Sequence, residues 1–115
     1  MSEQFDSSRP IYAQLVERLK ARILAGTYPP GGHLDSVRDL AAAAGVNPNT
    51  MQRALTELER DGLVYSQRTS GRYVTEDRDV ISAARHALAA GKVRTFLSDM
   101  TALGFEKEEL LSQLR

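Results

Sequence analysis

Hydrogen-bonding side chains crowd a short stretch near the middle of the chain, at Asn49, Thr50, Gln52 and Arg53. Side chains of these types bind base edges and phosphates. Just before them, Asn47 is a good helix N-cap, and Pro48 suits the first helical position, where a missing N–H costs nothing. The spacing therefore predicts a helix with a polar, exposed leading edge, of the kind that enters a DNA major groove.

The elements around this edge fit the same prediction. The helix has an apolar stripe from Ala54 to Leu58 and ends near Gly62. A shorter helix precedes it, with Ser36 as its N-cap and Gly45 at its end. Two short helices joined by a glycine-containing turn are typical of a helix-turn-helix. Ordinary helical bundles contain such pairs too, so this pattern alone leaves both interpretations open.

Two short β-prone runs follow, at residues 63–65 and 73–75, with a turn-rich segment between them. They predict a β-hairpin directly after the polar helix, which is the position of a wing. Arg68 and Arg72 lie in the expected turn, where they could contact a phosphate or enter a narrow minor groove. The alternative is a solvated hairpin whose arginines only keep it soluble. Its place beside the polar helix favours the wing.

A first helix is predicted from Pro10 to about Ala25, ending at Gly26, because apolar residues repeat there at helical spacing. Residues 1–9 are polar and expected to be a flexible N-terminus, in which only Phe5 contacts the domain. We therefore expect a fold that is mainly α with a small β-wing. It would consist of a winged helix-turn-helix DNA-binding domain over residues 10–75 and a helical dimerisation tail over residues 76–115.

The tail carries a second apolar stripe, which is weakened near Gly91 and stops at Gly104, before a short final helix. One small domain offers too little surface to cover this helical pair, so we predict that it packs against the same pair of another chain. The residues assigned to this contact are Ile81, Leu88, Phe96, Leu97, Met100, Leu103 and Leu110. The alternative is that the tail folds back on its own domain. A two-fold homodimer would bind a palindromic operator, with half-sites about one helical turn apart.

Composition and charge narrow the class of protein. The chain has 115 residues, of which 42% are hydrophobic and 26% charged, as in an ordinary globular protein. No apolar run is long enough to cross a bilayer and no signal peptide is recognisable, so we expect a cytoplasmic protein without a membrane partner. The formal net charge is zero. DNA binding would therefore depend on where the arginines lie rather than on overall charge.

Nothing in the sequence favours an enzyme. The chain has no cysteine, which excludes disulfides, thiol catalysis and cysteine-based metal sites. His33 and His86 are the only histidines and have no nucleophile or metal-ligand spacing, so we expect both at or near the surface. We expect no catalytic residue, metal or cofactor. The remaining competitor is a winged helix that binds protein, which would not need the polar edge of residues 47–53.

Motifs in register run from Pro10 to Val74: Pro-Ile-Tyr-Ala-Gln-Leu at 10–15, Leu-Asp-Ser-Val-Arg-Asp-Leu-Ala at 34–41, Gly-Val-Asn-Pro-Asn-Thr at 45–50 and Gly-Arg-Tyr-Val at 71–74. Together they resemble the GntR family of bacterial transcription regulators. The tail, with Leu-Gly-Phe at 103–105 and Glu-Glu-Leu-Leu at 108–111, resembles the YtrA-type subfamily. The resemblance implies a homodimeric repressor with a two-helix dimerisation tail, often controlling a neighbouring operon that includes an ABC transporter.

The resemblance also implies DNA contacts where the motifs match. With the residues chosen by chemistry, the predicted contacts are Arg38, Asn47, Asn49, Thr50, Gln52, Arg53, Arg68, Gly71 and Arg72. Two positions depart from the family pattern. Asp35 stands where the family usually has proline, and its carboxylate could hold Arg38 away from a phosphate. Thr69 replaces the first wing glycine, which would change how the wing tip bends.

We expect no separate effector-binding domain after the winged helix, because residues 76–115 are assigned to the dimerisation tail. A small-molecule effector, if one acts on this protein, is therefore expected between the tail and the head or at the dimer seam, with a bend at Gly91.

Overall fold

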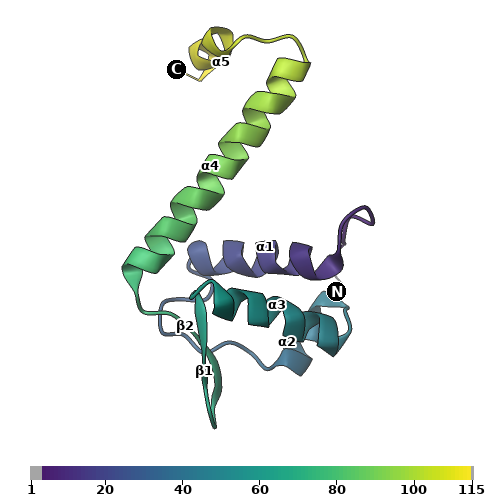
Figure 1. The fold of residues 1–115 in the computed structure, drawn as a ribbon, viewed down its shortest axis with the longest axis vertical. Coiled ribbons are helices and arrows are strands. Elements are labelled where there is room, and N and C mark those ends of the chain that lie inside the picture. The colour runs from purple at the N-terminus through teal and green to yellow at the C-terminus, as the bar shows by residue number, and fades with distance from the viewer. Residues whose placement is uncertain (1–3, 115) are drawn as a thin grey trace. The chain divides into compact units, whose positions relative to one another are not determined.

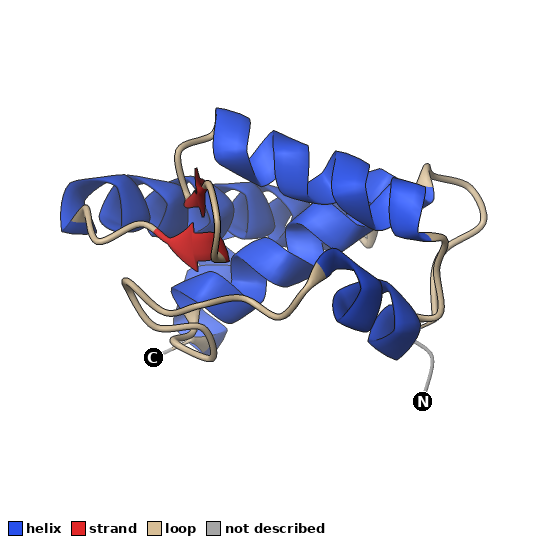
Figure 2. Cartoon of the chain, turned by 90° about the horizontal axis from the view of Figure 1, so that it is seen from below, coloured by secondary structure: helices blue, strands red, loops and turns tan. Residues whose placement is uncertain are grey.

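The computed structural model describes residues 4–114, and this part of the chain is mainly helical (Figures 1 and 2). Its elements are the helices α1 (Ile11–Leu24), α2 (Val37–Ala44) and α3 (Pro48–Arg60), the strands β1 (Val64–Gln67) and β2 (Gly71–Val74), and the helices α4 (Arg78–Ala102) and α5 (Lys107–Gln113). The predicted fold class, with three helices and a hairpin followed by two further helices, is confirmed.

The chain divides into two compact units, and the division falls between Ile81 and Ser82. The sequence placed the boundary slightly earlier, at residue 75. The first turn of α4 belongs with the first unit because its side chains pack there. Ile81 is buried, and Val80 lies 4.0 Å from the position that a Cβ on Gly62 would occupy.

In the first unit, α1 and α3 lie side by side (Figure 1). Apolar residues at helical spacing give each helix one buried face, and these faces form the core with residues of α2 and the wing. The most deeply buried large side chains are Leu15, Met51, Leu55, Leu58, Leu63 and Val74. This core fixes the second helix of the helix-turn-helix against the first helix of the chain, and it leaves the opposite face of α3 exposed.

Both helix starts of the helix-turn-helix form as the sequence predicts. The Ser36 hydroxyl accepts a hydrogen bond from the Asp39 backbone N–H at 3.1 Å. The Asn47 side chain accepts one from the Asn49 N–H at 2.7 Å. Between the helices, Gly45 has φ +72°, a left-handed conformation that side chains disfavour, and this reverses the chain within a few residues.

The strands of the wing extend further into the hairpin than the sequence suggests. They are antiparallel, with Gln67 opposite Gly71, so the turn contains only residues 68–70. The segment before α2 adds to the pairing, because the Leu34 N–H donates to the Arg72 carbonyl and the Val74 N–H donates to the Gly32 carbonyl, each at 2.9 Å. Arg72 therefore lies in β2 and not at the tip of the wing, where we had placed it.

Residues 4–9 are attached to α1, although their polar composition suggested a loose segment. The buried Gln14 side chain accepts a hydrogen bond from the Asp6 N–H at 2.8 Å and donates to the Asp6 carbonyl at 2.7 Å. Phe5 is half-buried beneath the Arg18 guanidinium, as expected for that residue. Residues 1–3 of the predicted flexible segment lie outside the described residues.

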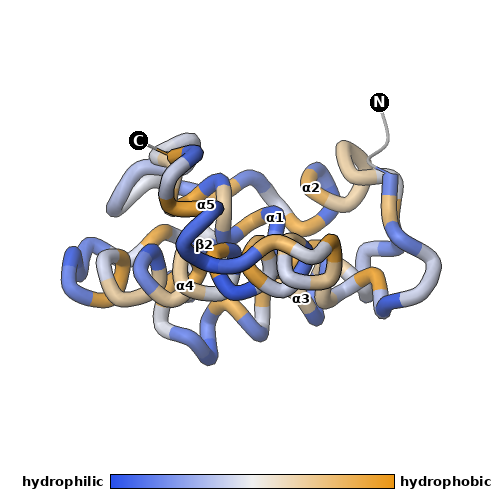
Figure 3. The backbone as a smooth tube through the Cα atoms, turned by 90° about the horizontal axis from the view of Figure 1, so that it is seen from above, coloured by the Kyte–Doolittle hydropathy of each residue, from blue (hydrophilic) through white to orange (hydrophobic). Residues whose placement is uncertain are grey.

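In the second unit, α4 continues through Gly91 without a break. The helix α5 begins with a capping box formed by Glu106 and Glu109, and its Leu110 is buried. Along these helices hydrophobic and hydrophilic positions alternate (Figure 3). Many of the apolar side chains remain exposed within the described chain; the large ones are Val93, Phe96, Leu103, Leu111 and Leu114.

Candidate nucleic-acid interface

The outward face of α3 carries most of the side chains that the sequence assigns to DNA. Asn49, Gln52 and Arg53 are exposed and Thr50 is half-buried, while the other side of the helix forms the core. The exposed Thr56 extends this face by one turn, and the sequence analysis missed it. Its place four residues after Gln52 could have revealed it, because side chains at that spacing share a face. The oxygen of Asn47 is used to cap the helix.

Arg53 does not extend freely from this face. Its guanidinium carbon lies over the Tyr12 ring, 3.6 Å from the ring centre, so the cation contacts the aromatic face. Tyr12 is half-buried in the first turn of α1. The contact between Tyr12 and Arg53 was not predicted, because nothing local connects residues that far apart in the sequence.

Arg38 is exposed at the second position of α2. Within residues 4–114, no ion pair joins Arg38 to Asp35, so the Asp35 carboxylate does not hold this side chain away from a phosphate. The Arg38 side chain is thus left at the start of the helix-turn-helix, on the same unit as the α3 face.

The two wing arginines have different surroundings. Arg68 is exposed in the turn, but the Arg72 Nε donates a hydrogen bond to the Glu59 carboxylate of α3 at 2.5 Å. The Ser66 hydroxyl donates to the same carboxylate oxygen at 2.8 Å. Both strands of the wing are therefore tied to α3 through one side chain.

The bonds from Arg72 and Ser66 also affect the pKa of the Glu59 carboxyl group. Its partial burial raises the pKa of the carboxyl group, but the hydrogen bonds from Arg72 and Ser66, together with the positive charge of Arg72, outweigh burial. The net result is a pKa below the ordinary value, so Glu59 is ionised at neutral pH.

His33 supports the turn of the wing from the segment before α2. Its Nε2 lies 2.6 Å from the Ser70 carbonyl oxygen, and its ring packs against Tyr73 at 4.8 Å between centroids. A Cβ on Gly71 would come within 2.9 Å of that nitrogen, and Gly71 has φ +105°, so glycine is required there. Thr69, which replaces the other family glycine, has no positive φ and fits the turn without strain.

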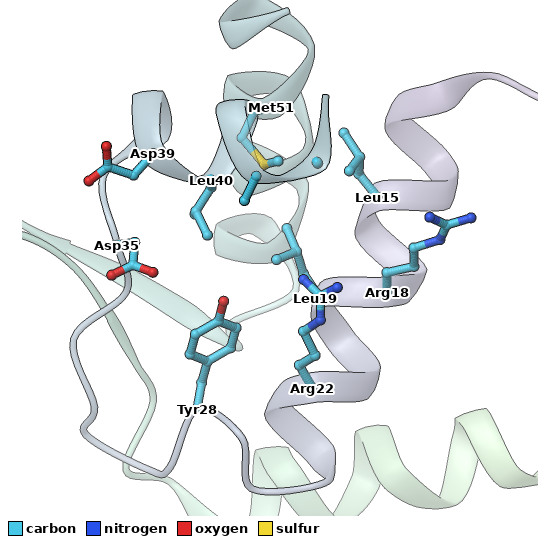
Figure 4. A pocket seen from close by; sticks show the side chains of 11 residues that line it. Leu15, Arg18, Leu19, Arg22, Tyr28, Asp35, Asp39, Leu40 and Met51 are labelled. Atoms are coloured by element: carbon cyan, nitrogen blue, oxygen red, sulfur yellow. The ribbon is translucent and has the colours of Figure 1, made fainter. Parts of the chain in front are cut away.

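A hollow of about 300 Å³ lies within the first unit, between α1 and α2 (Figure 4). Leu15, Leu19, Leu40 and Met51 provide an apolar lining, while Tyr28 and Asp35 approach it from the connecting segment (Figure 4). The sequence predicted any effector site between the tail and the DNA-binding domain or at the dimer seam, and a hollow made by packed helices leaves no local sequence signal.

Across the described residues, no cluster of three or more histidine, cysteine or acidic side chains is arranged to hold a metal ion. None of the helices formed by these residues is long and apolar enough to span a membrane. The His86 Nδ1 lies 2.8 Å from the Ser82 carbonyl oxygen in the same helix, where it can donate a hydrogen bond to that oxygen.

This arrangement is that of a winged-helix DNA-binding protein, a class in which the second helix of the motif enters the major groove. The sequence pattern of the bacterial regulatory proteins of the gntR family matches residues 11–74, so the chain belongs to this family. It is a DNA-binding transcriptional regulator and not an enzyme.

A relative and two solved structures extend this assignment. The transcriptional repressor YtrA of Bacillus subtilis is 34% identical over 105 residues, which cover 90% of this chain and 81% of YtrA. The chain is thus of the YtrA type. A GntR family regulator from Listeria monocytogenes has a TM-score of 0.87 and 41% identity, covering 96% of both chains. The DNA-binding domain of AraR in complex with operator ORR3 has a TM-score of 0.57 and 28% identity, covering 65% of this chain and 88% of that one.

Proposed function

We propose that the protein is a repressor that binds a palindromic operator as a homodimer. The observation that carries this proposal is the exposed polar face of α3, flanked by the Arg38 side chain and by the wing. In a winged helix, this face lies in the major groove and the wing lies near the minor groove. A bacterial protein with this target acts in the cytoplasm, where the chromosome lies.

Each predicted contact has a role that follows from its surroundings. Asn49, Gln52 and Arg53 are placed to recognise base edges, since their side chains are exposed on one face of α3. Phosphate contacts fall to Arg38, Thr50 and the Asn47 amide, and the wing contributes Arg68 and the backbone at Gly71. Because Glu59 engages Arg72, we assign Arg72 to holding the wing and not to DNA.

The proposed homodimer is supported by the apolar surface of the second unit. Phe96 on α4 is 40% exposed and Leu103, just after the helix, is 69% exposed, while Leu88, Leu97 and Met100 on α4 are half-buried. Large apolar side chains left exposed in this way are typical of an association site. Ile81 and Leu110, which the sequence also assigned to the dimer, are already buried within their own units and are left out of the proposed contact.

The proposed repression rests on the relatives, and the proposed target operon rests on the resemblance to the YtrA-type subfamily. YtrA is named a repressor, and the AraR domain was crystallised with operator DNA. We infer by similarity that this protein represses a nearby operon that includes a transporter.

The test is selection of genomic DNA fragments by the purified full chain, followed by sequencing and by sedimentation of the complex. We expect an inverted repeat whose half-sites lie roughly 34 Å apart, bound by two chains. A variant carrying both R38A and R53A is the control and should select nothing. Selection of an asymmetric site by one chain, or no selection by the wild type, would overturn the proposal.

A further inference from the structure

We infer that Tyr12 is a specificity-determining residue, which acts by holding the Arg53 guanidinium in the orientation that recognises a guanine. Tyr12 lies outside the helix-turn-helix, on α1, and no DNA contact is assigned to it. The inference rests on the proposed function, because it concerns how one residue of the DNA face is positioned.

The first step is the geometry of the stack. The guanidinium carbon of Arg53 lies 3.6 Å from the Tyr12 ring centroid, which is contact distance for a cation over an aromatic face. A guanidinium carries its N–H donors in its own plane. Stacking therefore covers the face of the group and leaves the donors at its edge available for the two acceptors of a guanine.

The second step is the rigidity of the support. Tyr12 is half-buried in the first turn of α1, and Leu15 and Leu19 of that helix belong to the core that contacts α3. At the other end, Lys20 of α1 pairs with Asp61 after α3 at 3.5 Å. The ring is thus fixed relative to α3. An arginine held on it loses less side-chain freedom when it binds DNA than a free one does.

The third step is that Arg53 gains more from a fixed support than its neighbours on α3 do. Asn49 and Gln52 share the exposed face of α3 but have shorter side chains, which can adopt fewer orientations. Arg53 is the one arginine in the first two turns of α3, so it gains most from a fixed support. Loss of the ring should therefore affect the base pair that Arg53 contacts more than any other position.

The experiment compares Tyr12→Leu with Tyr12→Phe in the full chain, on the selected operator and on operators altered at single base pairs. R53A identifies the base pair that Arg53 recognises. Tyr12→Phe keeps the ring and should bind like the wild type. Tyr12→Leu should lose roughly two- to five-fold in discrimination at that base pair, the range expected for an exposed cation–π contact. It should cause no further loss when R53A is already present.

Three results would overturn the inference while leaving the proposed function intact. In the first, Tyr12→Leu weakens binding to all duplexes equally, also in the R53A background, which is the behaviour of a purely structural residue. In the second, it binds the operator more tightly, so that the stack holds Arg53 away from DNA. In the third, R53A discriminates among the altered operators as the wild type does, so that Arg53 recognises no base pair. Failure of the wild-type chain to select any operator would instead overturn the proposed function, and this inference with it.

Discussion

At the scale of single residues, arginines that look alike in sequence differ in what surrounds them. Arg38 is exposed and forms no ion pair with Asp35. Arg53 lies over the Tyr12 ring, and Arg72 donates a hydrogen bond to Glu59. The number of donors left for DNA depends on these contacts rather than on residue type. The three arginines therefore have different surroundings, and the roles proposed for them in phosphate contact, base contact and wing support rest on this difference.

Arg38→Ala and Arg53→Ala should consequently weaken operator binding in different ways. Loss of a phosphate contact by Arg38→Ala should act uniformly across sequences and lower the salt dependence by about one ion. Arg53→Ala should relax specificity at one base pair, at a cost of about 1–3 kcal/mol. Gel shifts on operator and non-operator duplexes measure both. Lys107→Ala on α5, which removes the same charge, is the control, and equal behaviour of all three variants would refute the assigned DNA face.

At the scale of elements, the position of the wing depends on its bonds to α3. Arg72 and Glu59 are 18% and 31% exposed, so their ion pair is partly shielded from water, and Ser66 adds a second bond from the other strand. The segment before α2 holds the wing on its other side, through His33 and the backbone of residues 32–34. The hairpin is therefore fixed beside α3 before any DNA binds.

Glu59→Gln should loosen the wing while preserving the shape of the side chain. We expect a loss of about 1 kcal/mol in unfolding free energy and faster trypsin cleavage after Arg68. Glu57→Gln removes a carboxylate that pairs with the exposed Arg60 and should change little, which makes it the matched control. Equal cleavage rates for the two variants would show that the Glu59 bonds do not hold the wing.

The pH dependence follows from the sign of the Glu59 shift. Because its pKa is lower in the folded protein than the ordinary 4.5, its stabilising effect is complete above that pH. The effect is lost as the pH falls through the lower folded value. The stability difference between wild type and Glu59→Gln, measured by urea unfolding, should therefore shrink in acid.

At the scale of the whole molecule, the two units present different surfaces. The first exposes a polar helix face and arginines, whereas the second exposes large apolar side chains on α4 and α5. The net charge of the chain is zero. Affinity for DNA therefore requires local contacts, and a symmetric dimer would double their number by presenting two DNA-binding domains.

Phe96→Glu should disrupt the proposed dimer, because a carboxylate would have to enter an apolar contact. We expect the dissociation constant of the dimer to rise by roughly two orders of magnitude and operator binding to fall with it. Sedimentation at several concentrations measures the first effect. Ser98→Glu places the same charge about half a turn away and should leave the dimer intact. A Phe96→Glu chain that remains dimeric would exclude this face.

Much of the fold is determined by local sequence. Ser36 and Asn47 start their helices, Gly45 reverses the chain between them, and apolar spacing marks the buried faces of α1 and α3. The tail helices follow from the same kind of pattern. Each of these features depends on residues within a few positions of one another, and local preferences are enough to predict them.

Only the tertiary structure decided the contacts between distant segments. The Tyr12 ring contacts the Arg53 guanidinium, Glu59 accepts a hydrogen bond from Arg72, and the Gln14 side chain donates one to the Asp6 carbonyl. The wing strands extend into the expected turn because Ser66 and Gln67 pair with Arg72 and Gly71, and residues 32–34 add hydrogen bonds to β2. The sequence by itself thus determined the helices, the turn and which residues are polar. Packing decided which arginine side chains remain available for DNA, because their neighbours come together only when the chain folds.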